Sequence, residues 1–376
     1  MKTQSILYNF RTSFYNFIFF LFTIFGFSQT ITLSEKTKVS VLTCDSGTQL
    51  HSLFGHTAIR INDPVNDFDA VYNFGYFDFN TPNFYLKFVK GDMKYFVAVG
   101  SFENFMPEYV YYQRGVYEQF LNISQTQKQH IFDNLNQILQ SDDRFYTYKF
   151  IDRNCTTMII DLVNKHIDTK ISNKIPDQSS TNRKILYGYL NHHFYESLGI
   201  NIIFGAKVDR QFSNIFLPMQ FFEALIISKN QGVNLITTTK TLNKQTAEVP
   251  FSVWNNCYSL ILVLAIIVFV SKRWLTIAYF SLLGLVGILL FSVSFYSFHQ
   301  EVHENYNVFL FNPLYVFLAF SMVRNLKKTS VILIYIITAT LVCYSIFIVN
   351  KPFFVMFIPF IIANGILLYK TSKNCK

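Results

Sequence analysis

The chain has little charge for its length, and this shortage limits what kind of protein it is. Only 15% of its 376 residues are charged, whereas 51% are hydrophobic and 18% are aromatic. Such a composition is too apolar for an ordinary soluble protein and predicts a soluble domain joined to a membrane domain. The net charge of +9 is explained first by topology signals, so nucleic-acid binding is not expected.

The cysteines lack the spacing of a metal site. Five are present, and no two of them stand in a CxxC pattern: Cys44, Cys155, Cys257, Cys343 and Cys375. No disulfide framework can be read from these positions either. We therefore expect neither a metal nor another cofactor.

Residues 1–28 are typical of an export signal. Lys2 and Arg11 precede an apolar stretch at 17–27, and Ser28 with Gln29 fits a cleavage site. The alternative is an uncleaved short anchor. In both cases the chain from Gln29 onward is expected outside the cytoplasm.

Residues 29–228 are predicted to form an α+β domain. Strand-like segments lie at 38–43, 57–62, 70–79 and 94–99, and helices are predicted at 125–139, 155–165 and 183–195. The polar stretch 229–252, rich in Thr, Lys and Asn, is expected to be a linker.

Residues 253–376 are predicted to form an all-α transmembrane domain with five helices. Apolar runs of spanning length lie at 254–270, 275–298, 308–323, 331–349 and 353–369. Basic residues cluster at 272–273, 324–328 and 370–376, on one side of the membrane. This asymmetry predicts an outer N-terminal domain and a cytoplasmic C-terminus.

Cys155 is the candidate nucleophile. It stands at a predicted helix start, where Asn154 supplies N-cap chemistry and the helix dipole lowers the pKa of a thiol. His56 enters a predicted strand about a hundred residues earlier. A helix-start thiol with a strand histidine is the arrangement of papain-like enzymes, although here the histidine comes first.

Other interpretations of these residues stay open. A cysteine at a helix start is more often a packing residue, and Cys44, which follows a strand, is the rival thiol. Asn73, on the next strand, is expected to orient His56; the alternative is a strand amide without that role. Asn154 and Thr156 are the candidates for support of an oxyanion or of the local structure.

A polar loop at 299–312 faces the same side as the thiol domain. It holds two histidines, two glutamates and three asparagines. The candidate substrate-binding residues, for a lipid headgroup or an amine, are His303, Asn305, Asn307 and Asn312. The alternative is an ordinary polar loop with an Asn-Pro break. The HxxxH pattern lacks a third metal ligand.

Segments 54–60, 71–79 and 153–157 resemble the periplasmic domain of Lnb-type lipoprotein N-acyltransferases. Residues 305–307 and 311–314 are similar to the outer-face motif of that family's membrane domain. A basic residue often follows the Cys-Thr-Thr triplet in the family, whereas this chain has Met158, which puts an anion-binding role there in doubt. The His-before-Cys order is also similar to permuted papain-like enzymes such as lecithin:retinol acyltransferase.

The resemblance implies a permuted papain-like domain in the periplasm and a multi-pass domain in the bacterial inner membrane. It further implies transfer of an acyl chain from a membrane phospholipid, through a Cys155 thioester, to the α-amino group of a diacylglyceryl lipoprotein's N-terminal cysteine. One alternative is a periplasmic membrane-anchored cysteine peptidase, amidase or other hydrolase of this thiol fold. The other is a non-catalytic receptor or scaffold with a buried Cys155.

Overall fold

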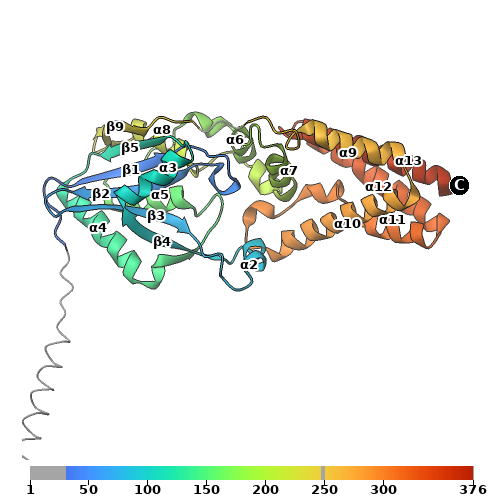
Figure 1. Cartoon of the computed structure of the whole chain (residues 1–376), viewed down its shortest axis with the longest axis horizontal. Helices are drawn as coiled ribbons and strands as arrows, with labels where there is room; N and C mark the ends of the chain where they lie inside the picture. Colours follow the sequence, from blue (N-terminus) through green and yellow to red (C-terminus); the bar gives the residue numbers. More distant parts are fainter. Residues whose placement is uncertain (1–30, 247–249, 376) are drawn as a thin grey trace, which may run out of the picture.

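The computed structural model describes residues 31–246 and 250–375, and the export signal predicted at 1–28 lies outside the described residues. The described chain has two regions that follow each other along the long axis of the molecule (Figure 1). A sheet-based domain occupies one end, and a helical bundle with the C-terminus occupies the other. This arrangement confirms the predicted α+β domain followed by an all-α domain.

The sheet-based domain is built on a seven-stranded antiparallel sheet. The strand order is β6-β4-β3-β2-β1-β5-β9. The strands are β1 Lys38–Cys44, β2 His56–Asp63, β3 Phe68–Tyr76, β4 Lys94–Ser101, β5 Val116–Leu121, β6 Phe145–Thr147 and β9 Ile236–Asn243. The four strands predicted from residue alternation are therefore confirmed as β1 to β4, although β3 ends before residue 79.

Helices cover both faces of this sheet. On one face, Val41 and Ile59 share a core with Ile131 of α4 (Gln125–Gln140) and Ile159 of α5 (Cys155–His166). On the other face, Ala58 and its neighbours pack against α3 (Phe102–Tyr111). Because successive side chains of a strand point to opposite faces, the central strands are apolar on both sides. Helix α8 (Pro218–Ile227) lies against β1 and α5.

One predicted helix is wrong. The stretch 183–195 is divided between α6 (Asn182–Gly188) and α7 (Phe194–Ile203). Between them, His192 adopts a φ of +67°. An L-residue in this left-handed region cannot continue an α-helix, so the chain turns here.

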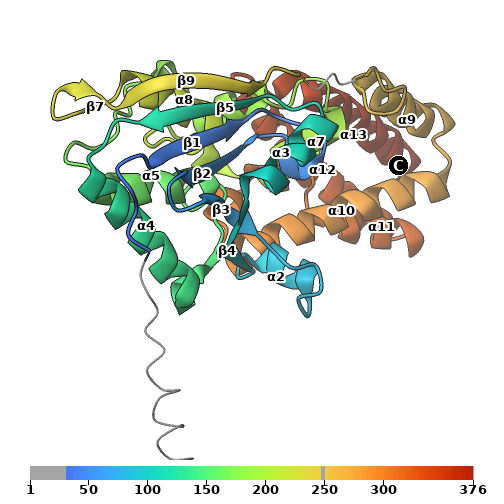
Figure 2. The same cartoon turned by 60° about the vertical axis from the view of Figure 1, so that its left-hand side comes forward.

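The linker expected at 229–252 is also corrected. Strands β7 (Lys229–Asn230) and β8 (Val233–Asn234) form a short hairpin, and β9 then pairs antiparallel with β5. Figure 2 shows β9 along the edge of the sheet beside β5. The polar threonines of β9 are exposed because it is an edge strand, which explains why the segment looks like a linker in the sequence.

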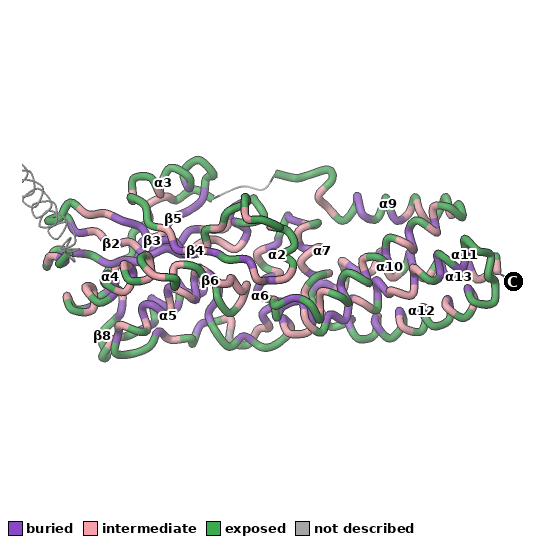
Figure 3. The backbone as a smooth tube through the Cα atoms, turned by 90° about the horizontal axis from the view of Figure 1, so that it is seen from below, coloured by how far each residue is buried: buried purple, intermediate pink, exposed green. Residues whose placement is uncertain are grey.

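The helical bundle contains the five expected helices, but they differ in length. They are α9 Cys257–Val270, α10 Arg273–Tyr296, α11 Leu314–Val323, α12 Lys327–Ile348 and α13 Phe354–Cys375. Within the described ranges, α10, α12 and α13 are long and apolar enough to span a membrane, and residues 300–323 add a fourth span if their 41° break is allowed. Exposed and buried turns alternate along the bundle (Figure 3), and many exposed side chains are large and apolar.

Candidate active site

Asn154 holds the start of α5. Its side-chain oxygen accepts hydrogen bonds from the backbone N–H groups of Thr156 at 2.9 Å and Thr157 at 3.0 Å. Its side-chain nitrogen donates to the carbonyl oxygens of Phe150 at 2.8 Å and Phe216 at 2.9 Å. Both ends of the buried amide are therefore occupied, and Asn154 supports the local structure through the expected N-cap.

His56 and Asn73 are brought together by the pairing of β2 with β3. Asn73 lies opposite Ala58, so His56, two residues earlier on the same face, is its diagonal neighbour. His56 Nε2 is 3.1 Å from Asn73 Oδ1. Because an amide oxygen only accepts, Nε2 carries the hydrogen and leaves the lone pair of Nδ1 free for a proton.

Cys155 and His56 form an electrostatically coupled pair. Burial alone would raise the pKa of the Cys155 thiol, but attraction to His56 and hydrogen bonding from His56, Thr57 and Thr156 together lower it. Burial lowers the pKa of His56, but the neighbouring Cys155 and the hydrogen bond to Asn73 outweigh it and raise that pKa. These opposite shifts favour a thiolate and an imidazolium. We call Cys155, His56 and Asn73 the thiol cluster.

Thr156 connects the cysteine helix to the histidine strand. Its hydroxyl lies 2.9 Å from the hydroxyl of Thr57, next to His56 in β2, and both side chains are fully buried. The backbone N–H of Thr156 is already bonded to Asn154. The N–H of Cys155, at the first position of α5, has no acceptor within a helix and is the better candidate donor to an oxyanion.

Cys44 differs from Cys155 although β1 brings it close. It is opposite His56 in the register of β1 and β2, and its side chain is completely buried. Burial raises the pKa of the Cys44 thiol to about 12. A thiol with that pKa carries almost no thiolate near neutral pH, so its environment favours packing over nucleophilic attack.

The predicted substrate-binding residues lie in the docking loop, which we define as residues 299–313. Asn305 donates to the carbonyl oxygens of Ile202 and Ile203 at 2.9 and 2.7 Å. Asn307 donates to the carbonyl oxygens of Asn201 and Ile202 and accepts from the Tyr344 hydroxyl. Both side chains join the docking loop to α7 (Phe194–Ile203), which itself packs against the core of the bundle.

His303 and Asn312 also have partners within the protein. His303 Nε2 lies 2.7 Å from the carbonyl oxygen of Ser297, and Asn312 donates to Thr340 Oγ1 at 3.0 Å. The loop approaches the domain closely at Gly205, where an added Cβ would lie 1.8 Å from the carbonyl oxygen of His303. The structure thus places all four predicted residues at contacts within the protein and does not bring them into the thiol cluster.

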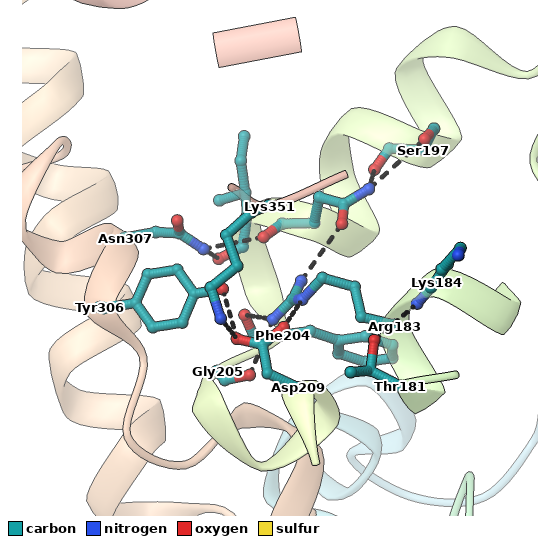
Figure 4. A network of polar contacts seen from close by, with 12 residues as sticks. Thr181, Arg183, Lys184, Ser197, Phe204, Gly205, Asp209, Tyr306, Asn307 and Lys351 are labelled. Carbon is teal, nitrogen blue, oxygen red and sulfur yellow. Dashed lines mark hydrogen bonds and ion pairs between the residues drawn. The ribbon is translucent and has the colours of Figure 1, made fainter. Parts of the chain in front are cut away.

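A second group of residues fastens the two regions together (Figure 4). Buried Arg183 donates to Asp209 at 2.6 Å and to the carbonyl oxygen of Gly205 at 2.8 Å. The other carboxylate oxygen of Asp209 accepts from the Tyr306 hydroxyl at 2.8 Å and from Lys351 Nζ at 2.9 Å. Because Tyr306 and Lys351 belong to the bundle, Asp209 bridges both regions.

Glu301 of the docking loop contacts the loop before Cys155, and sequence reasoning did not single it out. Its Oε1 accepts a hydrogen bond of 2.9 Å from the backbone N–H of Ile151, in the loop that leads to Cys155. Glu301 is only 3% exposed. No local pattern signals this contact, because the two residues are 150 positions apart.

No group of three or more His, Cys, Asp or Glu side chains is placed to hold a metal among the residues described.

Comparison with known families yields two matches: the Lnb N-terminal periplasmic domain over residues 28–186, and the Lnb transmembrane domain over residues 243–375. Between them lies the segment that carries α7, Asp209, α8 and β9. No curated protein and no solved structure matches the chain.

Proposed function

Because this chain belongs to the Lnb family of lipoprotein N-acyltransferase-like membrane proteins, we propose that it transfers an acyl chain from a membrane phospholipid to a bacterial lipoprotein. The acceptor is the α-amino group of the lipoprotein's N-terminal cysteine, and Cys155 carries the chain as a thioester. The observation that carries the proposal is the thiol cluster, in which the pKa of Cys155 is lowered and that of His56 is raised.

In the first step, the Cys155 thiolate attacks an ester carbonyl carbon of the phospholipid. The backbone N–H of Cys155, at the first position of α5, stabilises the negative oxygen of the tetrahedral intermediate. The C–O bond then breaks, and imidazolium His56 gives its proton to the departing oxygen. The products are a thioester on Cys155, a lysophospholipid and neutral His56.

In the second step, the amine nitrogen attacks the thioester carbonyl carbon. Neutral His56 removes a proton from that nitrogen as the C–N bond forms. The C–S bond breaks, and Cys155 leaves as a thiolate beside a protonated His56. The starting pair is thereby restored, with Asn73 holding the imidazole in place through both steps.

The proposed orientation places the N-terminal domain in the periplasm and the C-terminus in the cytoplasm. The docking loop and Lys351, in the turn between α12 and α13, both contact the periplasmic domain. The C-terminus lies at the opposite end of the bundle (Figure 1). Lys370 is near the C-terminal end of α13, where it donates to the carbonyl oxygen of Val268, and Arg273 is the first residue of α10. Apart from Lys351, the basic clusters of the bundle are thus at the end away from the domain, which agrees with the excess of positive charge in cytoplasmic loops.

The test is mass spectrometry of lipoprotein N-termini from cells that contain or lack the protein. We expect an added N-acyl chain only when the wild-type protein is present, and its loss in a Cys155→Ser variant that still inserts in the membrane. N-acylation that does not depend on the protein would contradict the proposal. Release of free fatty acid or a cleaved peptide without amine acylation would indicate a hydrolase of this thiol fold.

A further inference from the structure

Helix α2 (Phe84–Lys90) has five apolar or aromatic residues and two lysines, and none of its residues is fully buried. Tyr85 is 80% exposed and Leu86 is 69% exposed, and Phe79, just before the helix, is 72% exposed. A helix on a soluble surface normally buries its apolar face against the protein. A contiguous exposed apolar surface of this kind marks contact with a partner or a membrane.

Three hydrogen bonds fix α2 at the periplasmic end of α10. Ser297 Oγ donates to the carbonyl oxygen of Val89 at 2.8 Å, and the N–H of Phe298 donates to that of Lys90 at 2.7 Å. His299 Nε2 lies 3.0 Å from the carbonyl oxygen of Phe88. Helix α2 lies beside the end of α10 that is nearer the sheet (Figures 1 and 2). Since α10 is long enough to span a membrane, this is the end at which it would leave the bilayer.

The apolar surface of α2 continues onto α10. Phe295 and Tyr296, in the last turn of α10, are 78% and 58% exposed. Lys87 and Lys90 are the charged residues of the stretch 79–90, which has no acidic side chain. Aromatic residues with a few lysines are typical of segments that lie in the membrane interface.

A row of aromatic rings leads from α2 into the domain. Phe79 contacts Phe77 with ring centres 4.9 Å apart, and Phe77 contacts Tyr95 at 5.2 Å. Tyr95 stacks on Tyr148 at 4.6 Å. Tyr148 and Cys155 both pack against the same buried core of the domain, and burial, followed by the charge of Cys155, raises the pKa of Tyr148.

We propose that α2 inserts in the outer leaflet of the membrane and that the ring row is the path of a phospholipid acyl chain to Cys155. The ring row comprises Phe79, Phe77, Tyr95 and Tyr148. This inference rests on the proposed function and identifies how the acyl donor is bound. Apolar rings suit a hydrocarbon chain because they remove its surface from water. The donor can then remain partly in the bilayer while its ester reaches the thiol.

Insertion can be measured without reference to activity. Tyr85→Trp and Tyr111→Trp form a matched pair, because the two tyrosines are 80% and 79% exposed and Tyr111 is the last residue of α3. Helix α3 lies over the sheet, away from α10 (Figure 1). The full-length variants are reconstituted in vesicles of phosphatidylcholine with brominated acyl chains. We expect the fluorescence added by the tryptophan at position 85 to be quenched and that added at position 111 to be unquenched. Equal quenching of both, or quenching of neither, would overturn the insertion of α2.

The acyl path is tested by donor kinetics. Leu86→Asp should raise the apparent KM for vesicle phospholipid about tenfold, because a charge opposes insertion, while Tyr111→Asp leaves it unchanged. Phe77→Ala should change the ratio of long-chain to short-chain donor turnover without changing iodoacetamide labelling of Cys155. If Cys155→Ser is inactive but these variants act like wild type, the path is wrong and the proposed function stands. If Cys155→Ser is active, the proposed function itself fails.

Discussion

The thiol cluster and the docking loop both combine histidine with asparagine, but their polar groups have different partners. In the thiol cluster, Asn73 Oδ1 contacts the Nε2 atom of His56, and the nearby Cys155 raises the pKa of the same imidazole. In the docking loop, the amides of Asn305 and Asn307 donate to backbone carbonyl oxygens of the neighbouring domain. A segment rich in polar residues can therefore form either a catalytic site or a contact between two parts of the protein. The hydrogen-bond partner of each polar group shows which of the two it forms.

The largest effect expected is at the nucleophile. Cys155→Ser should reduce acyl transfer roughly a thousandfold or more, since a hydroxyl with a far higher pKa cannot replace the thiolate. Protein abundance in membranes and transfer to a lipoprotein substrate are the measurements. If the serine variant transferred acyl chains at the wild-type rate, the thiol cluster would not be the catalytic site.

Loss of the residue that orients His56 should have a smaller effect. Asn73→Ala should lower the rate by about a hundredfold, as expected when a reacting group is poorly positioned. Asn73→Asp retains an oxygen at this position and should recover part of the activity. Rates in single-turnover assays check this expectation. Equal rates for wild type and Asn73→Ala would remove Asn73 from the cluster.

The pH dependence of alkylation sharpens the contrast between the two thiols. Because the pKa of Cys155 is lowered from 9.0, its reaction with iodoacetamide should persist as the pH falls below 9.0. In His56→Ala the midpoint of this reaction should move to higher pH, because the positive partner is gone. Peptide mapping would separate Cys155 from Cys44, whose pKa of about 12 predicts little reaction. A midpoint that His56→Ala leaves unchanged would argue against the ion pair.

In the docking loop, Asn307→Ala should change stability more than chemistry. The substitution removes hydrogen bonds to Asn201, Ile202 and Tyr344 from a fully buried site. The free energy of unfolding should fall by about 1–3 kcal/mol. Thermal unfolding and the alkylation rate of Cys155 in the folded fraction are the measurements. If Asn307→Ala kept the wild-type melting temperature but no longer transferred the acyl chain from Cys155 to the amine, the result would instead support direct binding of the lipoprotein acceptor by Asn307.

The smallest effect on turnover is expected at Cys44. Cys44→Ser keeps the size of the side chain but introduces a hydroxyl in a fully buried site beside Tyr109 and Val116. We expect near wild-type turnover per folded molecule and a modest loss of stability. Comparison of turnover with the amount of folded protein checks this. A loss of chemistry as large as that of Cys155→Ser would make Cys44 a participant.

Sequence reasoning succeeded where the signal was local. The N-cap at Asn154 and the pairing of neighbouring strands β2 and β3 follow from adjacent residues, so the sequence could place Cys155 at a helix start and Asn73 on the strand beside His56. The catalytic roles of these residues stay predictions. Sequence reasoning failed where a structural feature depends on residues far away in the sequence. The edge position of β9 depends on β5, and the bond from Ile151 to Glu301 depends on a loop far along the chain.

Two of the hydrogen-bonded connections between the periplasmic domain and the membrane domain have a consequence for the biogenesis of the protein. The loop before Cys155 is bonded to Glu301, and Asp209 is bonded to Tyr306 and Lys351. Glu301, Tyr306 and Lys351 all belong to parts of the chain that are synthesised after the periplasmic domain. Ribosomal synthesis delivers these residues only once later helices have crossed the bilayer. The cysteine loop therefore reaches its final shape after membrane integration, which delays maturation of the thiol until the chain lies among its lipids.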